Sequence, residues 1–145
     1  MTTEPRTLPL THPLTGTQLD AGLLVLRLAT GLVFVMHGYQ KFFQFTIPGT
    51  TQAFTQMGAP VPSLSAPLVA GVELIGGLLL ILGLLTRWAG AALAINMLVA
   101  IMLVHIGAGF FNPNGYEFPL TLLAASAALA LTGPGRFGLG RGKLR

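Results

Sequence analysis

The chain has 145 residues, of which 52% are hydrophobic and only 8% carry a charge. Because soluble domains contain about 25% charged residues, this composition excludes an ordinary soluble domain and indicates an integral membrane protein, as does the mean hydropathy of +0.74. The sequence contains no cysteine, which excludes thiol catalysis and iron–sulfur ligation by this chain alone.

Residues 1–19 are polar, and Pro5, Pro9 and Pro13 among them disfavour a helix. The segment lacks the basic start and the early apolar core of a cleavable signal peptide. We therefore interpret it as a flexible cytoplasmic tail, in which His12 is solvated.

The first predicted span covers residues 21–43, with Asp20 in a position that favours the start of a helix. Arg27, His37 and Lys41 fall within about 80° of one another on this helix and form one polar stripe. We expect the long side chain of Arg27 to reach the cytoplasmic surface. Lys41 either reaches the opposite surface or pairs inside the bundle, whereas His37 is too short to reach a surface and needs a buried partner.

Residues 44–65 connect the first two spans and contain aromatic residues and prolines but no charged residue. Residues 50–57 are compatible with a short helix that directs Phe54 toward the bundle, and Pro60 and Pro62 then interrupt the chain. A solvated linker would be more polar, so we expect this segment to fold back over the mouth of the bundle. There it either covers a pocket as a lid or anchors the protein at the membrane surface.

The second predicted span, residues 66–85, carries a single charged residue, Glu73. Ser65 and Pro67 occupy positions that helix starts favour. About 20 residues suffice to cross roughly 30 Å of hydrocarbon. An ionised carboxylate at that depth is costly unless it is paired, hydrated or protonated, so Glu73 is a candidate functional residue.

Glu73 is expected to face the interior of the bundle. Its side of the helix is rich in small residues, namely Gly76, Gly77 and Gly83, beside Leu80. A glycine-rich surface allows a neighbouring helix to approach closely, so this side of the helix faces protein and not lipid.

The third predicted span, residues 88–108, follows a tight turn at residues 86–88 that carries a basic and an aromatic side chain. Asn96 lies near its middle, and we expect its amide to donate a hydrogen bond to another helix. His105 lies near its far end. The spacing places Asn96 and His105 about 180° apart, so they are not expected to share one face.

The fourth predicted span, residues 118–132, follows a loop at residues 107–117 that ends in Glu117. The span is short for a crossing unless Tyr116 and Glu117 join it or the bilayer thins locally. Together the spans predict an all-α integral membrane four-helix bundle over residues 20–135.

Residues 136–145 form a basic tail, which carries much of the net charge of +4. We expect this tail to lie on anionic lipid and not on nucleic acid. Basic residues are concentrated at one end of the bundle, which predicts that both termini are cytoplasmic. The opposite, outer end then holds a group of ionisable residues: His37, Lys41, Glu73, His105 and Glu117.

Several kinds of site could be built from this group. Pairing with Lys41 would keep Glu73 ionised, and the histidines titrate in a range useful for proton transfer, so the group could serve a quinone that enters from the lipid. Haem held by His37 and His105, or zinc or iron held by His37, Glu73 and His105, is an alternative with less support. A purely structural polar network, including Asn96, is a further alternative.

The sequence resembles the DoxX family of small bacterial and archaeal membrane proteins over most of its length. The motifs that carry the resemblance are Arg27-Leu28 with Gly31, His37-Gly38-Tyr39-Gln40-Lys41-Phe42, Gly58-Ala59-Pro60, Glu73-Leu74-Ile75-Gly76-Gly77, Gly83 with Thr86-Arg87, His105, and Gly133-Pro134-Gly135-Arg136. The resemblance implies a four-helix membrane bundle associated with redox systems, some of them quinone-dependent. It also implies His37, Lys41, Glu73 and His105 as site residues, with Arg27 in a supporting role.

Three functions follow as hypotheses. The first is a subunit of a membrane oxidoreductase system, with no complete catalytic motif of its own, in a bacterial or archaeal plasma membrane. The second is a membrane scaffold or assembly partner, and the third is a carrier of protons or small solutes. Other redox proteins and further copies of the chain are the expected partners, besides the lipid bilayer.

Overall fold

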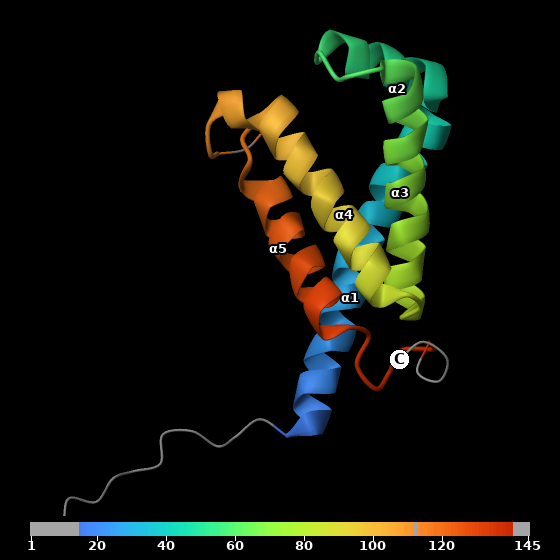
Figure 1. Ribbon diagram of the computed structural model, residues 1–145, viewed down its shortest axis with the longest axis vertical. Coiled ribbons are helices and arrows are strands. Elements are labelled where there is room, and N and C mark those ends of the chain that lie inside the picture. The colour runs from blue at the N-terminus through green and yellow to red at the C-terminus, as the bar shows by residue number, and fades with distance from the viewer. Residues whose placement is uncertain (1–14, 112, 141–145) are drawn as a thin grey trace, which may run out of the picture.

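The computed structural model describes residues 15–111 and 113–140, and every regular element in them is helical. The elements are α1 (Gly16–Tyr39), the π-helical η1 (Gln40–Gln44), α2 (Thr46–Gln56), α3 (Pro62–Leu82), α4 (Thr86–Ala100), the π-helical η2 (Ile101–His105), the 3₁₀-helical η3 (Ile106–Ala108) and α5 (Glu117–Thr132). Figure 1 shows the long helices running side by side, with α2 across one end. The expectations for residues 1–14, which include His12, and for Arg141, Lys143 and Arg145 lie outside the described residues.

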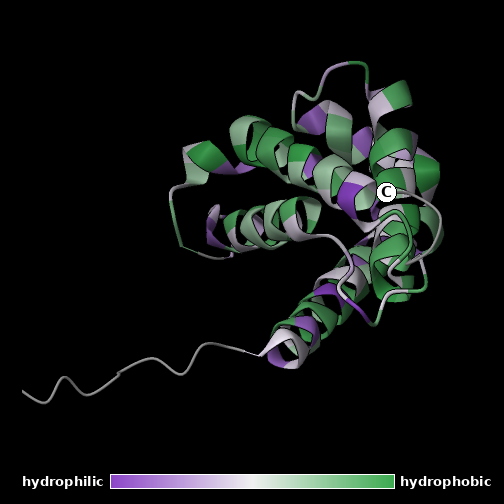
Figure 2. Ribbon diagram, turned by 60° about the horizontal axis from the view of Figure 1, so that its bottom comes forward, coloured by the Kyte–Doolittle hydropathy of each residue, from purple (hydrophilic) through white to green (hydrophobic). Residues whose placement is uncertain are grey.

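Within the described residues, three helical segments are long and apolar enough to cross a membrane: Gly16–Gln44, Pro62–Leu82 and Thr86–Ala108. Most of the helical ribbon in Figure 2 has the colour of hydrophobic residues, and large apolar side chains such as Ile75 and Leu131 are exposed. This is the surface that a bilayer requires, so the predicted helical membrane bundle is confirmed. The fourth helix, α5, is shorter, about 24 Å long.

The bundle consists of two closely packed helix pairs, α1 with α3 and α4 with α5. Glycines permit the close approach, because a Cβ atom on Gly77 would lie 2.7 Å from the carbonyl oxygen of Gly31, and one on Gly90 would lie 2.8 Å from that of Ser126. The predicted glycine-mediated contact of the second span is therefore present. The two pairs meet at the end where α3 turns into α4 and diverge toward the end that carries α2 (Figure 1).

The helix starts differ from those expected. Helix α1 begins at Gly16 because Thr15 and Gln18 form a capping box, and Asp20 instead accepts a hydrogen bond from the backbone of Arg136 at 2.8 Å. Helix α3 begins at Pro62, four residues before the predicted start, because the preceding Val61 adopts a left-handed conformation (φ 44°) and Pro62 suits the first helical turn. Helix α3 ends at Leu82, so the turn to α4 precedes Thr86.

We predicted that Arg27 reaches the cytoplasmic surface, but the structure buries it. It is only 2% exposed, and its guanidinium donates hydrogen bonds to the carbonyl oxygens of Phe137, at 2.6 Å, and Ile81, at 3.4 Å. The carbonyl of Ile81 belongs to the last turn of α3, where the helix dipole favours a cation. Arg27 therefore fixes the segment after α5 against the end of α3, where the backbone of Leu139 also donates to Leu82.

Candidate functional site

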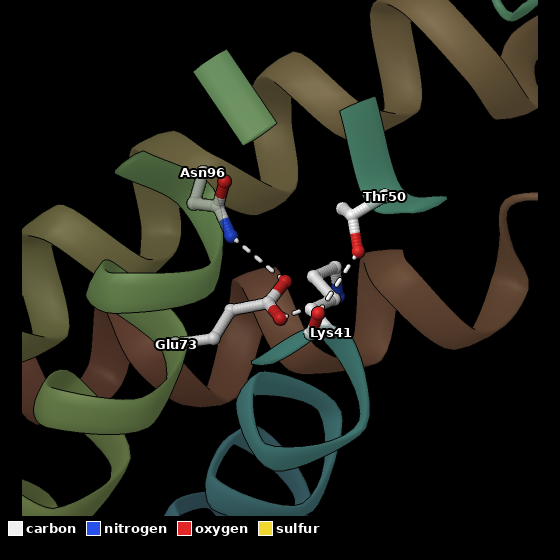
Figure 3. A network of polar contacts seen from close by, with 4 residues as sticks. All are labelled: Lys41, Thr50, Glu73 and Asn96. Atoms are coloured by element: carbon white, nitrogen blue, oxygen red, sulfur yellow. Dashed lines mark hydrogen bonds and ion pairs between the residues drawn. The ribbon is translucent and has the colours of Figure 1, made fainter. Parts of the chain in front are cut away.

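Glu73 lies at the centre of a polar network between three elements (Figure 3). The carboxylate is buried, with the residue 4% exposed. Its Oε2 atom pairs with Nζ of Lys41 at 2.5 Å, and its Oε1 atom accepts a hydrogen bond from Nδ2 of Asn96 at 3.2 Å. Glu73 thus faces the bundle, as predicted, and both of its carboxylate oxygens have a partner, which offsets the cost of its burial.

Lys41 belongs to η1, the π-helical end of the first membrane helix. Its side chain is 18% exposed, so the ammonium group reaches Glu73 from a partly open position. The carbonyl oxygen of Lys41 accepts a hydrogen bond from Oγ1 of Thr50 in α2 at 3.0 Å. Thr50 was not identified from the sequence, because a threonine in an uncharged segment carries no pattern that predicts such a bond.

A pocket of about 420 Å³ lies beside this network, between the diverging helix pairs. Its lining is mainly apolar and comes from α1, η1, α2, α3, α4, η2 and α5, and it includes Phe54, for which we predicted this direction. The polar groups that reach it are the three network residues and both histidines: Lys41, Glu73, Asn96, His37 and His105. An apolar cavity with a few convergent polar groups is the usual form of a small-molecule site, for which this volume is sufficient.

The two histidines approach the pocket from different sides. The His37 ring lies 6.1 Å from the ring of Phe118, measured between centroids. Nδ1 of His105 lies 2.9 Å from the carbonyl oxygen of Asn114, in the loop before α5. Both histidines are half-buried, so each can present a ring nitrogen to a ligand.

The prediction that Asn96 and His105 lie on opposite faces is wrong, because both line the pocket. The cause is η2, since residues 101–105 form a π-helix with i→i+5 hydrogen bonds. The additional residue in that turn rotates His105 by about 100° relative to an uninterrupted α-helix, which brings it toward the side of Asn96. Short π-helical segments are often found at functional sites.

The remaining candidates lie elsewhere. Arg27 is at the opposite end of the bundle, and Glu117, at the start of α5, is outside the pocket lining.

In the part of the chain that the structure describes, no three histidine or acidic side chains gather closely enough to hold a metal ion. His37, Glu73 and His105 therefore do not form the zinc or iron site considered above. Lys41, Asn96 and the histidines can instead offer hydrogen bonds to a small molecule in the pocket.

Comparison with known proteins gives consistent matches. The DoxX family model matches residues 22–106. A Bacillus subtilis protein named "Putative oxidoreductase CatD" is 41% identical over 79% of this chain and 81% of its own length. "Uncharacterized membrane protein Rv3486" of Mycobacterium tuberculosis is 35% identical over 82% of this chain and 79% of its own. "Inner membrane protein YphA" of Escherichia coli is 30% identical over 82% of this chain and 88% of its own. No solved structure gives a significant match.

Proposed function

This chain belongs to the DoxX family, and from that premise we propose that it is a subunit of a membrane-associated oxidoreductase system that uses a quinone. The name of the Bacillus subtilis relative suggests the reaction class. The observation that carries the proposal is the buried ion pair of Lys41 and Glu73 on the wall of an apolar pocket.

The polar groups suit a quinone head group. A quinone, when bound, supplies the redox chemistry, because it accepts electrons and protons. Lys41 has three N–H donors, of which Glu73 accepts one, so the ammonium can also donate to a carbonyl oxygen in the pocket. The ring nitrogens of His37 and His105 can donate or accept hydrogen bonds at the pocket wall. Electrons would come from a partner protein, because the chain has no cysteine and no complete catalytic motif.

The proposed setting is a bacterial plasma membrane, with both termini in the cytoplasm and the pocket near the outer surface. The name of the Escherichia coli relative YphA, which describes an inner membrane protein, supports this location. The concentration of basic residues beyond α5 supports the orientation. The partner is expected to be a redox protein that acts at the outer surface.

The test is quinone binding by the purified protein in lipid nanodiscs, with decylubiquinone as the probe. Glu73→Gln removes the charge that holds the ammonium of Lys41 in place. We expect it to weaken binding by at least about tenfold. Asp20→Asn is the matched control, because it makes the same chemical change at the opposite end of the bundle, where Asp20 lies beside Arg136.

Thermal unfolding of the same variants separates this function from a scaffold role. If Glu73→Gln lowers the unfolding temperature but leaves quinone affinity equal to that of the wild type, the network is structural and the proposal is wrong. The same conclusion follows if wild-type protein does not bind decylubiquinone.

A further inference from the structure

The pocket is only partly enclosed. Three of the apolar residues that line it are about half exposed: Met57 at 49%, Val99 at 47% and Leu103 at 48%. Val99 and Leu103 belong to Thr86–Ala108, a segment apolar enough to span the membrane. On a helix of this kind, an exposed apolar side chain contacts acyl chains. The exposed sides of Val99 and Leu103 are therefore expected to face lipid.

Part of the pocket lies between α3 and α4. Asn96 donates to Glu73, so this face of α4 is directed at α3. Val69, four residues before Glu73 on α3, and Val99, three residues after Asn96 on α4, both line the pocket. They lie one helical turn beyond the polar network, in the direction in which α3 and α4 diverge (Figure 1).

The polar wall carries no net charge from its ion pair, because Lys41 and Glu73 neutralise each other. A charged ligand would add an uncompensated charge to an apolar cavity, which is unfavourable. Lys41 and Asn96 still have N–H groups beyond those that bond to Glu73. The wall therefore favours a neutral head group with hydrogen-bond acceptors.

We propose that the ligand is a neutral amphiphile that enters laterally from the bilayer between α3 and α4. Its polar ring contacts Lys41 and Asn96, and its apolar chain leaves the pocket between Val69, Val99 and Leu103. This inference rests on the proposed function, and it adds the route, the charge and the chain-binding surface of the ligand.

The test compares decylubiquinone with the same ring lacking the decyl chain, in nanodiscs, after correction for partitioning into lipid. Leu103→Trp places a large side chain at the opening, and Met102→Trp is the control. Met102 is the adjacent residue, is 59% exposed and does not line the pocket. Leu103→Trp should weaken binding of decylubiquinone about tenfold and leave the chainless ring within about twofold. Met102→Trp should alter neither affinity.

If Leu103→Trp does not fold, Val99→Phe repeats the comparison one helical turn away. Its control is Leu98→Phe, because Leu98 is 49% exposed and does not line the pocket. A sulfonated naphthoquinone, which is anionic, should not compete with decylubiquinone.

Three results would overturn the inference while leaving quinone binding itself intact. They are equal effects of a variant and its control, equal losses of affinity for decylubiquinone and the chainless ring, and competition by the sulfonated naphthoquinone. If neither quinone binds wild-type protein, the inference falls together with the proposed function.

Discussion

At the scale of single residues, the position of Lys41 depends on a hydroxyl group in another helix. Thr50 is 3% exposed, and its hydroxyl donates to the carbonyl oxygen of Lys41 at 3.0 Å. Thr50→Val removes the hydroxyl donor, preserves the shape of the side chain and leaves the carbonyl oxygen of Lys41 without this hydrogen-bond partner. We expect the free energy of unfolding to fall by about 1–3 kcal/mol. Chemical unfolding of the variant and the wild type in one detergent measures the difference.

Thr55→Val is the matched control for this substitution. The hydroxyl of Thr55 donates to the carbonyl oxygen of Thr51 within α2 and is exposed, so its loss should change stability by less than about 0.5 kcal/mol. Thr50→Ser retains the donor and should recover most of the loss. If Thr50→Val and Thr55→Val are equally stable, the bond to Lys41 contributes little.

The residues of the polar network, and Arg27 at the opposite end of the bundle, differ in how well the sequence predicted them. The inward direction of Glu73 follows from the cost of a carboxylate in hydrocarbon. Its pairing with Lys41 was one of the two arrangements of Lys41 that the sequence left open. The role of Asn96 as an interhelical donor follows because a polar amide within an apolar helix also needs a hydrogen-bond partner. Thr50 and the burial of Arg27 could not be predicted, because each depends on backbone carbonyls that only the folded chain brings within reach.

At the scale of helices, the contact between α1 and α3 requires glycine. A Cβ atom on Gly77 would lie 2.7 Å from both the carbonyl oxygen of Gly31 and the backbone nitrogen of Val35. Backbone atoms cannot move aside easily, so Gly77→Ala should force the helices apart and lower the free energy of unfolding by about 1–3 kcal/mol. Gly71→Ala, on the same helix, has open space around its Cβ position, so it should be neutral or slightly stabilising. Thermal unfolding of both variants provides the comparison, and equal destabilisation would contradict it.

Helix positions were predictable, whereas their exact winding was not. Apolar length and the glycine pattern locate the long helices to within a few residues. The π-helical turns η1 and η2 add a residue to a turn without any compositional signal. For this reason the expected separation of Asn96 and His105 was incorrect, although each lies in the predicted helix. The start of α3 was displaced because Val61 adopts a left-handed conformation that periodicity does not predict.

At the scale of the whole molecule, the two ends of the described chain lie together. The backbone of Arg136, after α5, donates to Asp20 near the start of α1 at 2.8 Å. The guanidinium of Arg27 in α1 also holds Phe137. Helix α5 therefore returns to the end of the bundle where α1 begins, although at 16 residues it is shorter than the three segments Gly16–Gln44, Pro62–Leu82 and Thr86–Ala108. This geometry favours four crossings, with the bilayer thinned or Tyr116 and Glu117 included at the outer end of α5.

The last prediction follows from this return of the chain. Residues before α1 and after α5 should be cytoplasmic, and α2 should face the outer side. Because the chain has no cysteine, single substitutions give an unambiguous test with a membrane-impermeant thiol reagent. The cells must have a cell wall or outer membrane that the reagent can pass. In such intact cells, Gln56→Cys, at the end of α2, should react. Leu139→Cys and Thr17→Cys, both at exposed positions at the opposite end of the bundle, should react only after the plasma membrane is permeabilised. Labelling of Leu139→Cys but not Thr17→Cys in intact cells would mean that the termini lie on different sides, and α5 would then not cross the membrane.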